Sequence, residues 1–363
     1  MKIAENQNKY LPRLIAWEVT RSCNLDCKHC RAKASLGPYS GELSIQECFK
    51  VLEDIASLAK PVIILTGGEP MLREDIYDIA RYGNSLGLRM VMAPCGLLIN
   101  PETAKKIREA NIQKISISLD GATEETHDSF RGVKGAFKGA LQGIKYGKEA
   151  GIDFQINTTV SKYNLKEIPQ ILDLAQKLGA SVFDLFLLVP TGRGKDLVEQ
   201  EISPQEYEKM LNWVYEKSKN SPLKIKLTCA PHYNRVLLQK EKQKGEKSTS
   251  QERSSIPLSK GCMGGVSFAF ISHIGKVQIC GFLETECGDI KKEPFSYIWE
   301  NSEVLERIRD IDSYGGRCGY CEYRKVCGGC RARAHGITGD YLAEEPYCVY
   351  QPKAKRRVQI ESK

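Results

Sequence analysis

Three cysteines near the start of the chain, Cys23, Cys27 and Cys30, have the spacing to bind a metal centre. They directly follow an apolar run, residues 14–20, so we expect them in a loop at the end of a strand. Cysteine thiolates are the usual protein ligands of iron–sulfur clusters, whereas a structural zinc site takes four ligands in pairs. Three ligands leave one coordination position open for chemistry. A zinc loop with a remote fourth ligand is the alternative.

A second motif, Gly67-Gly68-Glu69-Pro70, follows the next apolar run, residues 62–66. Because the carboxyl ends of parallel strands meet at one edge, we expect this motif beside the cysteine loop. The two glycines leave the backbone free of Cβ atoms, and Glu69 adds a carboxylate. Such a strip can accept an ammonium group.

A second group of cysteines lies in the C-terminal quarter of the chain. Its members are Cys262, Cys280, Cys318, Cys321, Cys327, Cys330 and Cys348. The glycines around Cys318 to Cys330 allow tight bends, and the arginines there offset thiolate charge. The group indicates a further metal site, with a zinc ribbon as the alternative.

These loops need a sheet to position them, and the sequence alternates apolar runs with amphipathic segments. The expected strands are residues 14–20, 62–66, 89–93, 114–119, 154–160 and 182–189. The expected helices are residues 44–59, 75–86, 102–110, 136–149, 166–178 and 204–218. Six strand-then-helix units predict an α/β fold with a parallel sheet, either an open barrel or a doubly wound sheet.

The composition changes after this region. Residues 239–259 are polar, and two short expected strands, 267–272 and 276–280, follow them. The expected divisions are an N-terminal extension 1–13, a barrel 14–235, a flexible linker 236–260, a cluster-binding domain 261–350 and a charged tail 351–363.

Composition limits the class of protein. No apolar run reaches the roughly 20 residues of a membrane span, and the chain starts without an apolar signal segment, which predicts a cytoplasmic protein. There, 14 cysteines favour metal or thiol chemistry over disulfides. The net charge of +8 is too small and dispersed to indicate nucleic acid, and we expect a monomer.

CxxxCxxC and Gly-Gly-Glu-Pro at these positions resemble the radical S-adenosylmethionine (SAM) superfamily over about residues 14–230. The resemblance implies a partial (β/α)6 barrel like that of triosephosphate isomerase. It also implies a [4Fe-4S] cluster on Cys23, Cys27 and Cys30, whose unique iron chelates SAM and yields a 5'-deoxyadenosyl radical. The residues implied to bind SAM are His29, Gly67, Gly68, Glu69, Pro70, Ser118, Asp120 and Asn157. An ordinary role as strand polar residues stays open for Ser118 and Asn157.

The C-terminal cysteines resemble the SPASM extension, which carries auxiliary iron–sulfur clusters, although Cys327 and Cys330 are separated by two residues instead of the usual three. The resemblance implies one or two auxiliary clusters. The implied ligands of one are Cys318, Cys321, Cys327 and Cys348. A second would use Cys262, Cys280 and Cys330, with Cys287 or Cys229 as candidates for its fourth ligand.

Three segments, residues 228–233, 267–277 and 327–346, are similar to haem-forming members of this family. The similarity implies oxidative decarboxylation of two propionates of Fe-coproporphyrin III to vinyl groups, giving haem b, with an electron donor such as ferredoxin or flavodoxin. Haem d1-type modification, maturation of a peptide or protein by thioether, carbon–carbon or formylglycine formation, and a non-catalytic electron-transfer protein remain alternatives. The candidate residues for propionates or substrate iron are Arg193, His232, Arg235 and His273.

Overall fold

The computed structural model describes residues 10–243 and 261–353. Residues 1–9, 244–260 and 354–363 lie outside the described part, and they include most of the predicted N-terminal extension, linker and tail.

One sheet runs through the described residues. Its strands are β1 (Leu14–Thr20), β2 (Val62–Gly67), β3 (Arg89–Met92), β4 (Lys114–Ser118), β5 (Asp153–Val160), β6 (Val182–Leu187), β7 (Lys224–Thr228), β8 (Phe268–Ile271), β9 (Lys276–Cys280) and β10 (Leu283–Asp289). Their order in the sheet is β10-β9-β8-β1-β2-β3-β4-β5-β6-β7. Strands β1 to β7 are parallel neighbours, β8 is parallel to β1, and β9 and β10 are antiparallel.

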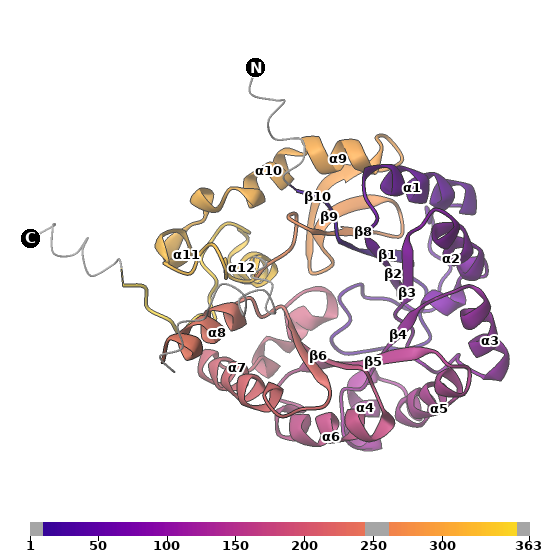
Figure 1. The fold of residues 1–363 in the computed structure, drawn as a ribbon, viewed down its shortest axis with the longest axis horizontal. Helices are drawn as coiled ribbons and strands as arrows, with labels where there is room; N and C mark the ends of the chain where they lie inside the picture. Colours follow the sequence, from indigo (N-terminus) through magenta and orange to yellow (C-terminus); the bar gives the residue numbers. More distant parts are fainter. Residues whose placement is uncertain (1–9, 244–260, 354–363) are drawn as a thin grey trace, which may run out of the picture.

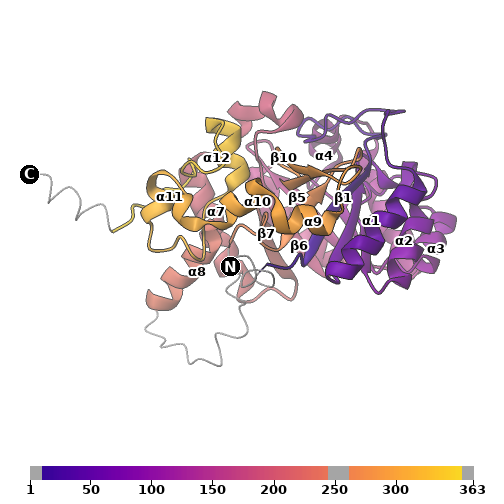
Figure 2. The ribbon, with the colours of Figure 1, turned by 90° about the horizontal axis from the view of Figure 1, so that it is seen from above.

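Helices surround the barrel strands on the outside (Figure 1). The helices of the barrel are α1 (Ile45–Leu58), α2 (Ile76–Ser85), α3 (Pro101–Glu109), α4 (Glu124–Arg131), α5 (Ala136–Glu149), α6 (Ile168–Leu178), α7 (Pro204–Ser218) and α8 (His232–Gln243). Those of the C-terminal extension are α9 (Phe295–Asn301), α10 (Glu303–Arg309), α11 (Gly316–Tyr320) and α12 (Arg331–Thr338). Helices α11 and α12 lie beside α7 and α8, as Figures 1 and 2 both show.

Local sequence explains where the first helix begins. The side chain of Ser44 accepts a hydrogen bond from the backbone N–H of Glu47, and the carboxylate of Glu47 accepts one from the backbone N–H of Ser44. This capping box satisfies N–H groups that have no partner within the helix. One side of α1, which includes Cys48 and Leu52, then packs into the core.

The barrel strands have two different faces. In β4, Ile115 and Ile117 are buried in the core, whereas Ser116 and Ser118 are partly exposed. The same alternation occurs in β5. Since the buried side packs against the helices, the side with Ser118 faces away from them, and we call it the inner face.

The predicted α/β barrel is confirmed, and the six predicted strands and six predicted helices agree with the structure to within two residues at each end. The sequence analysis missed β7, a short strand at the sheet edge in which lysines alternate with apolar residues. It also treated residues 236–243 as linker, whereas they belong to α8. The C-terminal extension joins the barrel sheet directly, because β8 pairs with β1.

No helix within residues 10–243 and 261–353 combines the length and apolar composition required to cross a membrane.

Candidate functional site

The cysteine loop follows β1, and its sulfur atoms receive hydrogen bonds. The backbone N–H of Leu25 donates to Sγ of Cys23, and that of Ala34 donates to Sγ of Cys30, both at 3.4 Å. Burial raises the pKa of the Cys23 thiol to about 12, so its thiolate needs a positive partner. Iron supplies that charge in a cluster, and N–H donors to sulfur are a usual feature of such sites.

The sulfur of Cys27, the remaining cysteine of the loop, accepts a hydrogen bond from a largely buried arginine that the sequence analysis missed. Arg131 donates to Sγ of Cys27 at 3.7 Å and pairs with Oδ2 of Asp120 at 2.5 Å. The other oxygen of Asp120 accepts the backbone N–H of Thr159 at 2.7 Å. Although burial alone would raise the pKa of Asp120, Arg131 lowers it. Asp120 therefore positions the arginine at Cys27, and its predicted contact with SAM stays a prediction.

His29 lies between the predicted ligands Cys27 and Cys30 in sequence and stacks on Phe130, with ring centroids 4.3 Å apart. Burial lowers the pKa of His29 to about 4, so the ring is neutral at neutral pH. A flat, neutral ring is suited to stacking, and the predicted contact of His29 with SAM stays a prediction.

The two glycines at the end of β2, Gly67 and Gly68, allow the backbone to approach the cysteine loop. A Cβ atom on Gly67 would lie 2.2 Å from the carbonyl oxygen of Thr20, and one on Gly68 would lie 2.4 Å from that of Ser22. The N–H of Gly68 also donates to the Thr20 carbonyl at 2.9 Å. Close packing of two loops thus explains both glycines without a ligand.

Glu69 is fully buried and bonded on both sides. Its Oε1 accepts the backbone N–H of Met71 at 3.0 Å, and its Oε2 accepts that of Cys95 at 2.6 Å. Burial raises the pKa of Glu69. The carboxyl group therefore braces the loop after β3, while Pro70 begins a short 3-10 turn. The predicted role of Glu69 and Pro70 in holding SAM stays a prediction.

Ser118 and Asn157 are register partners on β4 and β5, and both are partly exposed on the inner face. Oδ1 of Asn157 accepts a hydrogen bond from Gln155 at 2.8 Å. The structure thus brings the two predicted residues together, Ser118 at the carboxyl end of β4 and Asn157 within β5.

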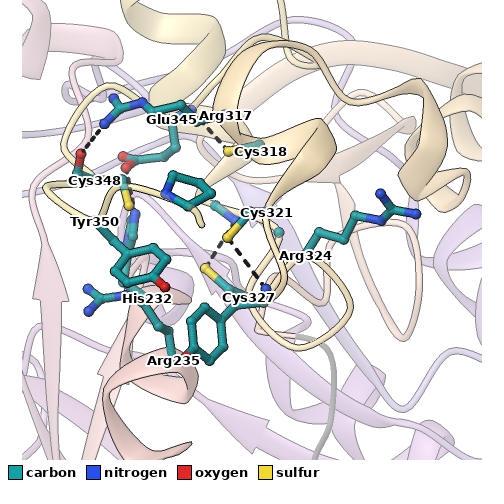
Figure 3. Close-up of a pocket in the computed structure, with 14 residues that line it drawn as sticks. His232, Arg235, Arg317, Cys318, Cys321, Arg324, Cys327, Glu345, Cys348 and Tyr350 are labelled. Carbon is teal, nitrogen blue, oxygen red and sulfur yellow. Dashed lines mark hydrogen bonds and ion pairs between the residues drawn. The ribbon is translucent and has the colours of Figure 1, made fainter. Parts of the chain in front are cut away.

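Four cysteines of the C-terminal extension line one cavity (Figure 3), and we call them the outer cysteine set. They are Cys318, Cys321, Cys327 and Cys348. Backbone N–H groups donate to the first three sulfur atoms at 3.4 Å, from Glu345, Tyr323 and Gly329, respectively. Arg331 adds a donor to Cys318 at 3.5 Å. The sequence analysis predicted this grouping as the ligands of one auxiliary cluster.

A second group, which we call the inner cysteine set, comes from more distant parts of the chain. Its members are Cys229, Cys262, Cys280 and Cys330. The side chains of Cys229 and Cys330 share a hydrogen bond, which lowers the pKa of Cys330. Beyond the effect of burial, the neighbouring Cys262 and Cys330 raise the pKa of Cys280. Cys287 lies elsewhere, beside Ser302 and Arg309, so Cys229 is the better candidate for a fourth ligand.

A buried ion network lies between the two cysteine sets. Oε2 of Glu345 is 2.6 Å from Nε2 of His232, and its Oε1 is 3.1 Å from Nη1 of Arg333. Arg333 also donates to the carbonyl oxygen of Cys229, and His232 bonds Cys348. Despite burial, these cations lower the pKa of Glu345 to about 2, so the carboxylate is ionised. Through Arg333 and His232, the network contacts one cysteine of each set, Cys229 and Cys348.

The four predicted substrate residues do not form one site. Arg193 donates to the carbonyl oxygens of Cys27 and Ala34 in the cysteine loop. His232 and Arg235 line the cavity of the outer cysteine set, whereas His273 bonds Glu18 on β1. Each therefore has a protein partner, and their contact with substrate stays a prediction.

The sequence analysis also missed Glu18 and Arg31. Nη1 of Arg31 lies 2.8 Å from Oε2 of Glu18. A signal for both was available, because Glu18 interrupts an apolar strand and Arg31 directly follows Cys30.

Within the described ranges, no three His, Cys, Asp or Glu side chains are grouped to hold a single metal ion. The cysteine loop and the outer set nevertheless fit iron–sulfur clusters, because their sulfur atoms accept N–H bonds and arginines lie beside them.

Comparison with known proteins supports this assignment. The Radical SAM superfamily model matches residues 17–175, and the model of the Iron-sulfur cluster-binding domain (SPASM) matches residues 262–331. An AdoMet-dependent heme synthase of Methanosarcina barkeri is 49% identical over 95% of this chain and 98% of its own length. The Fe-coproporphyrin III synthase of the same organism is 32% identical over 92% of this chain and 87% of its own length.

A solved structure shares the fold. Streptococcus suis SuiB bound to S-adenosylmethionine has a TM-score of 0.72 and 15% identity, over 94% of this chain and 78% of that one. The protein is thus a radical SAM enzyme, and its cofactors are a [4Fe-4S] cluster, SAM and auxiliary iron–sulfur clusters. The chain belongs to the radical SAM superfamily, in the family with a C-terminal iron–sulfur cluster-binding domain that includes the AdoMet-dependent heme synthases.

Proposed function

We propose that the protein converts Fe-coproporphyrin III to haem b by oxidative decarboxylation of two propionate side chains. The observation that carries the proposal is the match, over almost the full length of both chains, to an AdoMet-dependent heme synthase. In each step a propionate loses CO2, one hydrogen atom from its β-carbon and one electron, which leaves a vinyl group.

The three cysteines of the loop, Cys23, Cys27 and Cys30, would hold the catalytic [4Fe-4S] cluster. The outer cysteine set would hold one auxiliary cluster, and the inner set a second. When bound, the catalytic cluster and SAM supply hydrogen-atom abstraction, and the auxiliary clusters supply one-electron acceptors.

The protein's own residues supply position and charge. Arg131 donates to Cys27, and Arg193 fixes the backbone of the same loop. Ser118 and Asn157 present polar groups on the inner face, where they would contact SAM. These contacts hold the loop against the ends of the strands, so the reacting groups meet in one orientation.

Reductive cleavage of SAM consumes one electron and the substrate radical later releases one, so the electrons balance over a turnover. Because SAM must be cleaved before the substrate releases its electron, a donor has to supply the first electron, and we propose a small electron carrier of the ferredoxin or flavodoxin class for this role.

The test is anaerobic incubation of the cluster-loaded protein with SAM, a reductant and Fe-coproporphyrin III, followed by mass spectrometry. We expect two successive products, each lacking CO2 and two hydrogen atoms relative to its precursor, and none without SAM. Formation of 5'-deoxyadenosine with an unchanged porphyrin would contradict the proposal and favour another substrate.

A further inference from the structure

A fully buried carboxylate on β1 holds two arginines and a histidine. Nε of Arg21 donates to Oε1 of Glu18 at 3.0 Å, and Nη1 of Arg31 lies 2.8 Å from Oε2. Nδ1 of His273 lies 2.8 Å from Oε1. Burial opposes ionisation, but Arg31, His273 and Arg21 lower the pKa of Glu18 to about 2. One negative charge therefore faces two guanidinium groups, so this group of side chains has excess positive charge.

The guanidinium of Arg31 lies on the inner face, against β8. Its central carbon is 4.3 Å from the ring centroid of Phe270, which pairs in register with Ala16 of β1. A Cβ atom on Gly281 would lie 3.2 Å from Nε of Arg31, so the glycine leaves room beside the group. Glu18, Phe270 and Gly281 thus fix the orientation of the arginine.

Arg31 has hydrogen-bond donors to spare. A guanidinium carries five N–H donors in a planar fork. Within residues 10–243 and 261–353, Nη1 of Arg31 has the Glu18 partner and the other two nitrogens have none, while the side chain is 19% exposed. By contrast, Arg333 is fully buried, and both of its terminal nitrogens have partners, Nη1 in Glu345 and Nη2 in the carbonyl oxygens of Leu187 and Leu188. Arg31 can therefore accept a ligand, whereas Arg333 cannot.

The position of Arg31 favours substrate over SAM. In sequence it follows Cys30, and its neighbour Gly281 follows Cys280 of the inner set. The guanidinium consequently lies between the cysteine loop and the inner cysteine set. Of the residues predicted to bind SAM, Ser118, Asp120 and Asn157 lie on or after β4 and β5, at least three strands from β1. Residues 67–70 lie at the end of β2, on the other side of β1 from β8, and His29 in the cysteine loop stacks on Phe130 of α4.

We infer that Arg31 binds a carboxylate of the substrate at the β1–β8 side of the inner face. Naming that carboxylate a porphyrin propionate rests on the proposed function. Free N–H groups of a planar guanidinium match a carboxylate, and such charge-assisted bonds are among the stronger hydrogen bonds. Glu18 is the positioning residue, since it holds the arginine in place.

The test compares binding of Fe-coproporphyrin III and its tetramethyl ester by optical titration, on proteins matched for iron content. Arg31→Gln should weaken binding of the free acid about tenfold, which is about 1.4 kcal/mol. The ester, which lacks free carboxylates, should bind the wild type and Arg31→Gln equally. Arg31→Lys should retain part of the affinity, because it keeps the charge.

Arg81→Gln is the matched control. Arg81 lies on α2, its side chain is 51% exposed, and it pairs with Asp78 at 2.6 Å. This variant should bind both porphyrins as the wild type does. The KM for SAM, measured by 5'-deoxyadenosine formation, provides a second readout for each variant.

Wild-type affinity of Arg31→Gln for the free acid would overturn the inference, as would an equal loss for acid and ester. A rise in the KM for SAM with unchanged porphyrin binding would assign Arg31 to the SAM carboxylate and also overturn it. If the wild type binds the porphyrin through Arg31 without decarboxylating it, the proposed function fails and the inference holds. If the wild type does not bind the porphyrin, both fail.

Discussion

The cysteine loop and the inner cysteine set both bring several thiols together, but their cysteines are distributed differently along the chain. The loop takes Cys23, Cys27 and Cys30 from one short stretch after β1. The inner set instead combines a residue after β7, one before β8, one at the end of β9 and one before α12. A local sequence pattern therefore specifies the first site, whereas the second exists only once the extension has packed on the barrel.

Buried carboxylates differ in how far neighbouring cations compensate them. In the extension, Glu345 is compensated by His232 and Arg333, and its pKa falls to about 2. On β6, burial raises the pKa of Asp184 to about 6, and Lys226 and the hydroxyl of Thr228, 3.0 Å away, offset only part of that effect. Glu345, like Glu18 on β1, is thus an ionised carboxylate with cationic partners, whereas Asp184 on β6 is an acid whose ionisation burial disfavours.

The largest expected effect comes from the cysteine loop. Replacing Cys23, Cys27 and Cys30 together with Ala should abolish 5'-deoxyadenosine formation and lower iron content by about four atoms per chain, since one [4Fe-4S] cluster is lost. Cys48→Ala, on the buried side of α1, is the control and should keep both. Residual SAM cleavage by the triple variant would show that the local motif is not the catalytic site.

The next effect separates the two candidates for the fourth inner ligand. Cys229→Ser should lose about four irons and nearly all porphyrin product, because the inner set then has three thiols. Cys287→Ser should retain iron and product, since that thiol lies with Ser302 and Arg309. Iron and sulfide analysis checks both variants, and equal iron content in the two would contradict a four-cysteine inner set.

A stability effect should follow from the ion network. Glu345→Gln leaves two buried cations without their carboxylate and should cost about 3–5 kcal/mol of unfolding free energy. The neighbouring Glu344→Gln is the control: its side chain is 39% exposed and pairs with Arg317, so it should cost about 1 kcal/mol or less. Denaturant unfolding measures both, and similar costs would mean that the network has no special role.

The smallest effect depends on pH. Because Asp184 has a raised pKa in the folded state, its ionisation penalty is absent below about pH 4, grows up to about pH 6 and is constant above. Asp184→Asn should therefore stabilise the protein by up to about 3 kcal/mol at pH 8 and by progressively less as the pH falls from 6 toward 4. The Tm at pH 8 and pH 5 checks this.

Asp153→Asn on the adjacent β5 is the control for that measurement, because Asp153 is 47% exposed and pairs with Lys114. It should change the Tm little at either pH. A gain for Asp184→Asn that is independent of pH would exclude ionisation as its cause.

Sequence reasoning worked best where chemistry and periodicity are local. Apolar alternation located the first six barrel strands, the cysteine spacing indicated the loop, and the resemblance to the SPASM extension implied the outer set. It missed β7, an edge strand in which lysines interrupt the apolar pattern. It also missed Arg131, which contacts Cys27 although the two residues are 104 positions apart in sequence. Partners so distant leave no periodic signal, because only folding brings them together.

By itself, the sequence determined an α/β barrel, a three-cysteine loop at the end of its first strand and a C-terminal group of cysteines. Tertiary structure decided the rest. Strand β8 pairs with β1, and Cys229 lies with the inner set. Glu18 pairs with Arg31, whose guanidinium lies over the ring of Phe270. The physical reason is the distance along the chain between the residues that interact. Strand periodicity and thiol spacing are encoded over a few residues, whereas burial, ion pairing and ligand grouping depend on segments that meet only in the folded chain.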